Sequence, residues 1–303
     1  MSLEFDKIWM DGNFVDHAKA KVHILTHALH YGTAIFEGIR CYETKNGPAI
    51  FRLEEHIDRL YRGAKIYNFK IPYSKEELAN ACKMIIKKNK IDSAYIRPIV
   101  YLGYKMLGLD MEKVPVNVAI IAVKPFSPVK DSLKQVRCKI SSWRRIKTTI
   151  LSPHVKASAN YLNSVLAKAE AKNCGYDEAI MLNEDGHVSE ATGENVFIVN
   201  DNWINTPPLH DGVLSGITRD SILKIAKDLD YEVSEQSFFR DELIVADEVF
   251  LSGTAAEIVG VGNVDGATVG NGNIGKITKT LMEKYDKIVH GKEKEYEEWL
   301  DYV

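Results

Sequence analysis

The sequence has little cysteine: among 303 residues there are only four, far apart and without a C-x-x-C pair. That spacing argues against a cysteine-based zinc site and provides no disulfide framework. The four cysteines are Cys41, Cys82, Cys138 and Cys174.

Long hydrophobic runs are also missing. The longest aliphatic stretch, residues 114–123, contains Pro115 and Asn117 and is far too short to cross a bilayer. Residues 1–6 include two acids and no apolar core, so they do not resemble a signal peptide. We therefore expect a cytoplasmic protein.

An excess of charge of one sign is absent as well. Lysine and arginine total 39 against 42 acidic residues, a net charge of −3, and no basic run has interleaved aromatic residues. Such a chain has no global attraction for nucleic acid or anionic membranes. Hydrophobic residues make up 45%, which is ordinary globular composition. The length corresponds to about two domains, or to one large one.

Hydrophobic periodicity predicts a mixture of helices and strands. Ser74 and Glu77 have the spacing of a capping box and predict a helix start. The predicted helices are residues 53–67, from 74, from near 158 to before 175, from near 218, about 277–289 and about 292–300. The predicted strands are residues 7–10, 14–15, 93–102, 116–123, 136–142, 178–182, 196–199, 249–251 and 258–261.

The order of these elements predicts a two-domain α/β (α+β) protein, because strands and helices do not alternate as in a doubly wound sheet. Two prolines in residues 124–128 make this the best linker candidate. We expect a smaller N-terminal α/β domain over residues 1–124, a linker over 125–135 and a larger C-terminal domain over 136–303.

Two motifs resemble a dinucleotide site and a metal site, but we do not expect either to bind such a ligand. Residues 270–275 match G-x-G-x-x-G, but a dinucleotide site needs a further parallel strand, and the residues that follow are helical in pattern. His23, His27 and His30 have a spacing that helical metal ligands can use, but no carboxylate lies at ligand spacing. We expect loops at both places.

Three short patterns together suggest a phosphate-bearing aldehyde cofactor. Lys156 lies among small residues, and a desolvated lysine can form a Schiff base. Residues 214–220 open a helix at Gly216 and offer free amides to an anion. Residues 251–256 form a small-residue turn after a strand, which also suits a phosphate or carboxylate. A reactive lysine with two anion sites indicates pyridoxal 5′-phosphate.

The ordered set of motifs resembles the branched-chain amino acid aminotransferases, which are fold-type IV pyridoxal phosphate enzymes of class IV. The resemblance runs from about residue 8 to beyond 275. It implies a D-amino acid aminotransferase-like fold with a twisted, barrel-like sheet in the larger domain. The motifs are residues 31–42, 95–98 and 189–197 together with the three patterns above.

The resemblance implies a role for each matching cofactor residue. Lys156 would be the catalytic residue, holding the cofactor covalently and then moving the substrate proton. Glu190 would contact the pyridine nitrogen, with Glu194 as the rival candidate. Tyr161 would bind the phenolic oxygen. The phosphate would be bound by Arg59, which periodicity alone would place in solvent, and by the two turns: Gly216, Ile217, Thr218, Gly253 and Thr254.

The resemblance also implies the substrate site. Tyr95 and Arg97 would face the substrate carboxylate together with the amides of Thr254 and Ala255. Tyr31 would come from the other subunit of a homodimer. The apolar side-chain pocket would be formed by Phe36, Leu109 and Phe126.

The activity implied is transamination of L-leucine, L-isoleucine and L-valine with 2-oxoglutarate. The alternatives of the same fold are a D-amino acid aminotransferase and an aminodeoxychorismate lyase. From other classes, a metal-dependent hydrolase using the three histidines and a non-catalytic binding module remain open. We expect no membrane or nucleic-acid partner.

Overall fold

The computed structural model describes residues 6–124 and 135–303. Its contacts divide the chain into two compact units. The first unit comprises residues 1–126, 155–159 and 288–303, and the second comprises residues 127–154 and 160–287. Within the described residues, no helix combines the length and the apolar character that a bilayer crossing requires.

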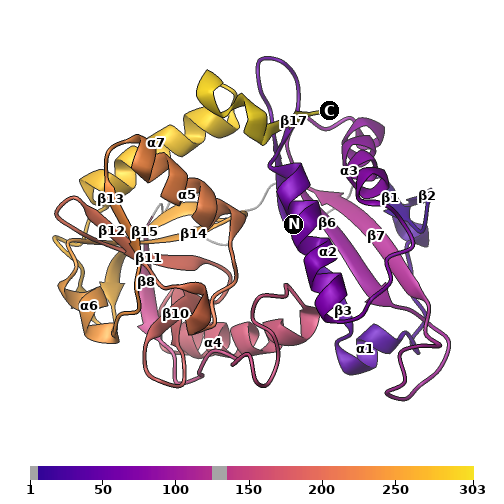
Figure 1. Ribbon diagram of the computed structural model, residues 1–303, viewed down its shortest axis with the longest axis horizontal. Coiled ribbons are helices and arrows are strands. Elements are labelled where there is room, and N and C mark those ends of the chain that lie inside the picture. The colour runs from indigo at the N-terminus through magenta and orange to yellow at the C-terminus, as the bar shows by residue number, and fades with distance from the viewer. Residues whose placement is uncertain (1–5, 125–134) are drawn as a thin grey trace. The chain divides into compact units, whose positions relative to one another are not determined.

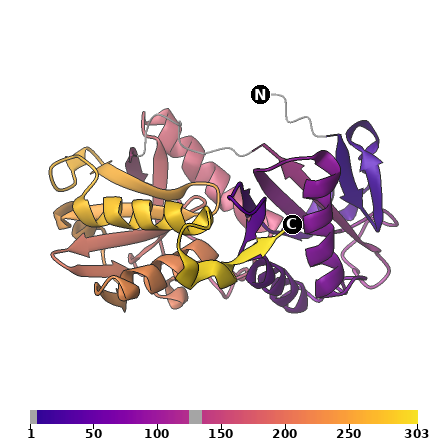
Figure 2. The same ribbon diagram turned by 90° about the horizontal axis from the view of Figure 1, so that it is seen from above.

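The first unit is built on an antiparallel sheet with the strand order β17-β5-β4-β6-β7-β1-β2, with β3 paired to β6 (Figure 1). Figure 2 shows the β1–β2 hairpin at the edge of this unit. The strands are β1 (Lys7–Met10), β2 (Asn13–Asp16), β3 (Ala34–Phe36), β4 (Ile39–Tyr42), β5 (Ala49–Phe51), β6 (Ala94–Leu102), β7 (Val116–Val123) and β17 (Leu300–Tyr302).

The helices of the first unit are η1 (His17–Lys19), α1 (His27–Tyr31), α2 (Leu53–Ile66), α3 (Lys75–Asn89) and η4 (Lys294–Trp299). Helix α2 buries Leu53, Ile57 and Leu60, as their spacing predicts, in one core cluster with strand residues. Helix α3 starts as predicted: the Ser74 Oγ accepts from the Glu77 amide at 3.1 Å, and Glu77 accepts from the Ser74 amide at 2.6 Å.

The second unit contains a ring of six strands closed on itself, in the order β8-β9-β10-β11-β14-β15 and back to β8. The pair Glu190–Asn195 joins β10 to β11 and belongs to this closure. The strands are β8 (Gln135–Ile140), β9 (Glu178–Leu182), β10 (Val188–Ala191), β11 (Asn195–Asn200), β12 (Trp203–Thr206), β13 (Glu232–Glu235), β14 (Glu248–Gly253), β15 (Glu257–Val264) and β16 (Ala267–Thr268).

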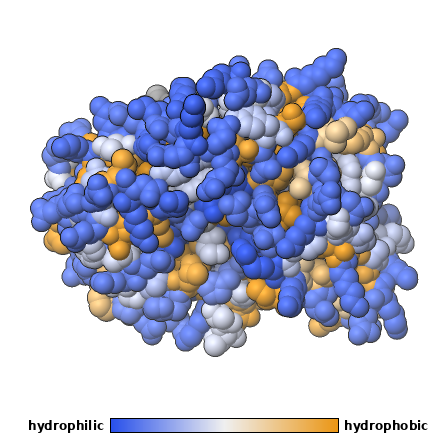
Figure 3. Space-filling model, turned by 45° about the horizontal axis from the view of Figure 1, so that its top comes forward, coloured by the Kyte–Doolittle hydropathy of each residue, from blue (hydrophilic) through white to orange (hydrophobic). Residues whose placement is uncertain are grey.

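The ring encloses an aliphatic core of its own, to which every one of its six strands contributes. The helices of this unit are η2 (Ser158–Asn160), α4 (Tyr161–Asn173), η3 (Leu209–Asp211), α5 (Ile217–Asp228), α6 (Arg240–Val245) and α7 (Lys276–Val289), the first and last of which include residues of the first unit. Ala167 and Ala171 let α4 pack closely on β9. Figure 3 shows a mostly hydrophilic face with hydrophobic residues in small groups.

The division by contacts differs from the sequence-based boundaries in two segments, Val155–Ala159 and Ile288–Val303, which group with the first unit. Strand pairing is the physical reason. Ala157 bridges to Ile35 of β3, and β17 pairs with β5. Residues 125–134, which hold most of the predicted linker, lie outside the described residues.

The predicted helix over residues 292–300 was wrong. Short 3-10 turns form instead, with non-helical backbone at Tyr296, and a strand follows. Burial explains the difference, because Tyr296 and Trp299 both enter the interior and Leu300 begins the pairing with Phe51.

Candidate functional site

Lys156 lies in an extended segment of the first unit, beside strand β3. Its neighbours Val155 and Ala157 are buried in the core, so alternation of side chains turns Lys156 the other way. The Lys156 carbonyl accepts a hydrogen bond from the Phe36 amide at 2.9 Å. Its Nζ lies 5.3 Å from the centroid of the Phe36 ring. A half-buried amine over an aromatic face is a better candidate for covalent chemistry than a solvated lysine.

Arg59 is buried, although helical periodicity alone would have placed it in solvent. Its guanidinium forms a bidentate ion pair with Glu37, with Nε–Oε1 and Nη2–Oε2 distances of 2.7 Å. His56 Nδ1 lies 2.8 Å from Glu37 Oε2. Burial favours the neutral form of Glu37, but the charge of Arg59 and the hydrogen bonds from Arg59 and His56 outweigh it and hold the pKa of Glu37 well below its usual range.

Tyr95 and Arg97 lie on β6 and face the same way, as their spacing predicts. Arg97 Nη2 donates to the Tyr95 hydroxyl at 2.9 Å, and the guanidinium carbon lies 4.5 Å from the centroid of the Phe36 ring. A Cβ atom on Gly38 would lie 1.9 Å from the Tyr95 hydroxyl oxygen, so any larger residue there would displace the Tyr95 side chain. A cation, a hydroxyl and an aromatic ring therefore meet on one face of the first unit, which suits a carboxylate beside an apolar group.

Tyr31 and Leu109 lie on two touching exposed segments of the first unit. The Gly108 amide donates to the Tyr31 hydroxyl at 3.2 Å, and Leu109 follows with 82% of its surface exposed. Tyr31 itself is 39% exposed. Phe126, the third residue of the predicted apolar pocket, lies outside the described residues.

In the second unit, Glu190 lies on β10 where the ring of strands closes. Arg145 Nη2 lies 2.6 Å from Glu190 Oε1, and both side chains are nearly fully buried. Glu190 Oε2 accepts from the Leu214 amide at 2.9 Å and from the Asn195 side chain at 3.3 Å. The rival candidate, Glu194, instead accepts from the Gly193 amide at 3.1 Å. Glu190 is thus the carboxylate that joins the strand closure to the loop before α5.

That loop leads to the N-terminus of α5, where Gly216 is the N-cap residue and Ile217 and Thr218 begin the helix. A Cβ atom on Gly216 would lie 2.0 Å from Asn195 Oδ1, so glycine permits the close approach. The first amides of a helix point along its axis and favour an anion. This geometry supports the predicted anion site.

Gly253 ends β14 and opens the turn that contains Thr254 and Ala255. It packs closely on the turn between β10 and β11, since a Cβ atom there would lie 3.2 Å from the Gly193 carbonyl oxygen. Tyr161 begins α4 and is half-buried. The predicted site residues thus form two groups, one in each unit.

The structure explains both the glycine-rich motif of residues 270–275 and the histidine cluster. The N-terminus of α7, after the glycine-rich residues 270–275, is capped by Glu248, whose carboxylate accepts from the amides of Ile277 and Thr278 at 2.9 and 2.7 Å. That carboxylate occupies the place a dinucleotide phosphate would need. The loop expected over these glycines is confirmed.

His23 lies in a loop, as expected, whereas His27 and His30 lie on the five-residue helix α1, and each histidine has a hydrogen-bond partner. His27 contacts Thr33 Oγ1 and the Gly108 carbonyl at 2.8 Å, His23 Nδ1 accepts from the Leu25 amide, and His30 Nε2 contacts the Ile24 carbonyl. No group of three His, Cys, Asp or Glu side chains able to hold a metal ion occurs within residues 6–124 and 135–303.

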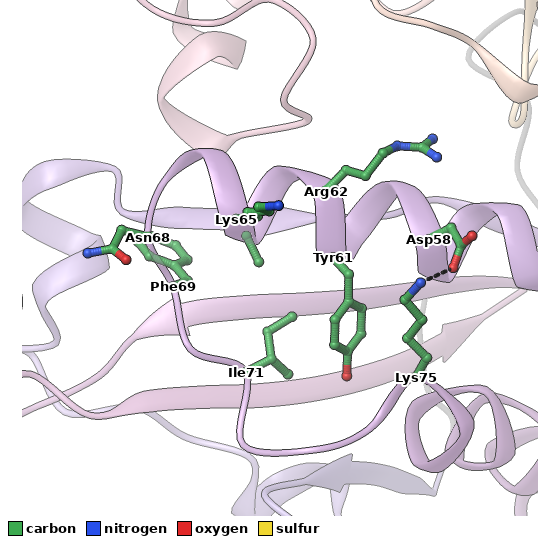
Figure 4. A pocket seen from close by; sticks show the side chains of 9 residues that line it. Asp58, Tyr61, Arg62, Lys65, Asn68, Phe69, Ile71 and Lys75 are labelled. Carbon is green, nitrogen blue, oxygen red and sulfur yellow. Dashed lines mark ion pairs between the residues drawn. The ribbon is translucent and has the colours of Figure 1, made fainter.

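A groove of about 650 Å³ lies on another face of α2, lined by Asp58, Tyr61, Arg62 and Lys65 of that helix and by residues up to Lys75 (Figure 4). The four helix positions share one side because of their spacing, away from the side of Arg59. Lys75 pairs with Asp58 at 2.7 Å across the groove. None of the predicted site residues lines it.

Sequence reasoning missed Glu37, His56 and Arg145. A single acid in the apolar run around β3 and β4 was a usable signal for Glu37, because a buried carboxylate needs a cationic partner. Arg145 had no such signal, since its partner Glu190 is distant in the chain and only the fold brings them together.

Comparison with known proteins identifies the family. The model of the amino-transferase class IV family matches residues 34–264, so the chain belongs to that family. A branched-chain-amino-acid aminotransferase of Escherichia coli is 44% identical over 301 residues, covering 98% of this chain and 97% of the relative.

Solved structures agree with that assignment. The branched-chain amino acid aminotransferase of Escherichia coli superimposes with a TM-score of 0.96 at 43% identity, covering 98% of this chain and 99% of that one. The T.th. branched-chain amino acid aminotransferase, solved with pyridoxamine 5′-phosphate and with N-(5′-phosphopyridoxyl)-L-glutamate, gives a TM-score of 0.95 at 44% identity, covering 99% of both chains. The predicted fold type is thereby confirmed.

Proposed function

We propose that this protein is a pyridoxal 5′-phosphate-dependent aminotransferase that interconverts branched-chain L-amino acids and their 2-oxo acids, with 2-oxoglutarate and L-glutamate as the second pair. The observation that supports this best is the near-complete match to branched-chain aminotransferases, in a chain that holds Lys156 beside the Phe36 ring. The glutamate adduct in the T.th. enzyme supports the second substrate pair.

The residues of both units fit the cofactor chemically. An aldehyde needs an amine, and Lys156 supplies one that is half-buried. A phosphate needs donors without bulk, and the glycine-started turns at Gly216 and Gly253 offer amides, with Arg59 as a cation. A pyridine nitrogen needs a carboxylate, and Glu190 is one that stays buried beside a cation. Tyr161 would bind the phenolic oxygen.

The protein's part in the reaction is to hold charges and move one proton. The bound cofactor supplies an electron sink for the pair released at the substrate α-carbon. Lys156 Nζ would hold the cofactor until the substrate amine displaces it, and the freed amine would then move the α-proton as a general base. Glu190 would place a carboxylate at the ring nitrogen, and Arg145 holds that carboxylate through an ion pair. The amides of Ile217 and Thr218, together with Thr254 and Arg59, would bind the phosphate.

Substrate selection depends on the face formed by Phe36, Tyr95 and Arg97. The Arg97 cation and the Tyr95 hydroxyl bind the substrate carboxylate, together with the amides of Thr254 and Ala255. Phe36 and Leu109 would contact the aliphatic side chain. An apolar pocket discriminates one methylene by only about 1–3 kcal/mol, so leucine, isoleucine and valine should all be accepted.

The working unit is proposed to be a homodimer. Tyr31 and Leu109 are exposed in the single chain, although a substrate-pocket role requires them to be covered. Two copies that exchange these segments would resolve this, since a two-fold interface presents the same patch twice.

All four cysteines are free thiols, which fits a reducing cytoplasm.

Absorption spectroscopy of the purified protein tests the function. We expect a yellow band that L-leucine bleaches and 2-oxoglutarate restores, and that Lys156→Ala abolishes. Bleaching by D-alanine instead of L-leucine would show the D-amino acid enzyme. Release of pyruvate from aminodeoxychorismate would show the lyase. If wild-type protein gains no band with added pyridoxal phosphate, the proposal is wrong.

A further inference from the structure

Glu37 is the most deeply buried acid of the first unit, with 0% of its surface exposed. It directly follows Phe36 at the end of β3, and its amide donates to the Pro98 carbonyl at 2.9 Å, which fixes its backbone against β6. A carboxylate in such a place is costly unless every lone pair has a partner. The groups that donate hydrogen bonds to the Glu37 carboxylate therefore indicate its role.

Both oxygens of the Glu37 carboxylate are engaged. Oε1 accepts from Arg59 Nε, and Oε2 accepts from Arg59 Nη2 and contacts His56 Nδ1. Burial lowers the pKa of His56, and the charges of Arg59 and Lys156 lower it further against the opposing effect of Glu37. The neutral imidazole then donates from Nδ1, because its acceptor is a carboxylate. The carboxylate is thus held by three donors from two side chains.

This arrangement fixes the direction of the guanidinium. An arginine has five N–H donors in a planar fork, and Glu37 takes the one on Nε and one on Nη2. Of the other three N–H groups, two are on Nη1 and one is the second N–H of Nη2, and they point away from Glu37. With the Nε–Nη2 edge held, the guanidinium cannot rotate about its Nε bond without breaking two charge-assisted hydrogen bonds.

We propose that Glu37 is a positioning residue for the cofactor phosphate, because it orients Arg59 so that Arg59 Nη1 faces the phosphate. His56 in turn holds the Glu37 carboxylate in place. This inference rests on the proposed function, because it takes Arg59 as a phosphate ligand. Glu37 acts through Arg59 and touches neither substrate nor cofactor. The effect should therefore appear in cofactor affinity and depend on the phosphate.

The test compares the dissociation constants of pyridoxal 5′-phosphate and of pyridoxal, which lacks the phosphate, in wild type and Glu37→Gln. The substitution keeps the shape of the side chain and removes its charge. We expect the affinity for pyridoxal phosphate to fall about 10- to 100-fold, the range lost when supporting partners of metal ligands are removed. The affinity for pyridoxal should change less than about threefold, because that aldehyde makes no contact with Arg59.

A buried acid elsewhere gives the matched control. Glu178 is 4% exposed in the second unit and pairs with Lys168 and Thr192. Glu178→Gln should leave the ratio of the two dissociation constants within twofold of wild type. If Glu37→Gln does not fold, as shown by circular dichroism, Glu37→Asp retracts the carboxylate while keeping its charge and is measured in the same way.

The double-mutant cycle separates this inference from the proposed function. Arg59→Met alone should lose the phosphate preference, and adding Glu37→Gln should then cost little more, because the two act as one unit. Equal weakening of both aldehydes by Glu37→Gln, or an unchanged ratio, overturns the positioning role. An unchanged ratio in Arg59→Met instead shows that the phosphate role proposed for Arg59 is wrong.

Discussion

Gly38 and Tyr95 are so close that a Cβ atom on the glycine would lie 1.9 Å from the tyrosine hydroxyl oxygen. Tyr95 is buried, and that hydroxyl accepts from Arg97 at 2.9 Å. The ring can yield to a larger residue only by giving up this hydrogen bond. The absence of a side chain at position 38 therefore holds the proposed carboxylate-binding pair in place.

Gly38→Ala should raise the KM for L-leucine by about 10- to 100-fold, since one lost hydrogen bond to a charged group is worth roughly 1.5–3 kcal/mol. The yellow band and the affinity for pyridoxal phosphate should stay close to wild type. Steady-state kinetics with L-leucine and L-glutamate measures the effect. An unchanged KM for both would show that Tyr95 does not contact the substrate.

Gly216→Ala should weaken the binding of pyridoxal phosphate by about tenfold or more, because crowding an anion site costs at least one charge-assisted hydrogen bond. The new Cβ atom would lie 2.0 Å from Asn195 Oδ1, and Asn195 is held by Glu190 and the Leu214 carbonyl. Equilibrium titration of the absorption band measures the affinity. Gly193→Ala is the control, since nothing lies within 4 Å of its Cβ position; equal losses in both variants would contradict the prediction.

Arg145→Met should destabilise the protein by about 3–5 kcal/mol, because it leaves the buried Glu190 carboxylate without its cation. Urea unfolding of the protein freed of its cofactor measures the loss. Lys147→Met removes a comparable cation from an exposed pair with Glu184, in which both side chains are 49% exposed, and should cost at most about 1 kcal/mol. Similar losses in the two variants would show that burial of the Arg145–Glu190 pair has no energetic consequence.

Stability should fall as the pH drops from neutral toward acid, for two separate reasons. Burial lowers the pKa of His56 below its usual 6.5, so the unfolded chain binds a proton that the folded protein does not. This loss begins near pH 6.5 and continues down to the folded pKa. The lowered pKa of Glu37 adds a second loss, which begins near pH 4.5 as the carboxyl is protonated in the unfolded chain.

His56→Asn isolates the first of these losses, because asparagine can donate to Glu37 but does not titrate. Between pH 7 and 5 the wild type should lose up to about 1.4 kcal/mol per pH unit more than the variant. Denaturant midpoints at pH 7, 6 and 5 measure the difference. Parallel curves for the two proteins would mean that His56 takes up its proton in the folded state as readily as in the unfolded chain.

Ser74→Ala should reduce the stability by about 1 kcal/mol, because it removes the side-chain acceptor for the Glu77 amide at the start of α3. Glu77→Gln keeps the reciprocal bond and should cost less. Thermal unfolding measures both, while kcat and cofactor affinity should remain at wild-type values. A change in cofactor affinity in Ser74→Ala would indicate a coupling that the capping box does not explain.

Elements with strong local signals were predictable from the sequence. The capping box at Ser74 and the periodic apolar positions of α2 each depend on neighbours in the chain, and both are confirmed. The turn at Gly216 was also predictable, because a glycine before an amphipathic run is a local pattern. In all three, the physical cause lies within a few residues of the signal.

Features that depend on distant partners were not predictable in this way. Arg59 looks solvated by periodicity, yet Glu37 makes its burial favourable from another element. Residues 292–300 have the pattern of a helix, but pairing of Leu300–Tyr302 with β5 and burial of Tyr296 outweigh helix propensity. The closure of the six-strand ring at Glu190 and Asn195 likewise has no signal in either strand alone.

The pairing of β17 with β5 has a consequence for how the chain acquires its shape during translation. Residues 300–302 follow the whole of the second unit in the sequence, yet they form the edge strand of the first. During translation, the strands of the first unit therefore leave the ribosome before β17 exists, and the edge of β5 that pairs with β17 stays exposed while the second unit is synthesised. Strand β17, which is synthesised after the whole of the second unit, thus adds the edge to a sheet whose other strands are synthesised before that unit.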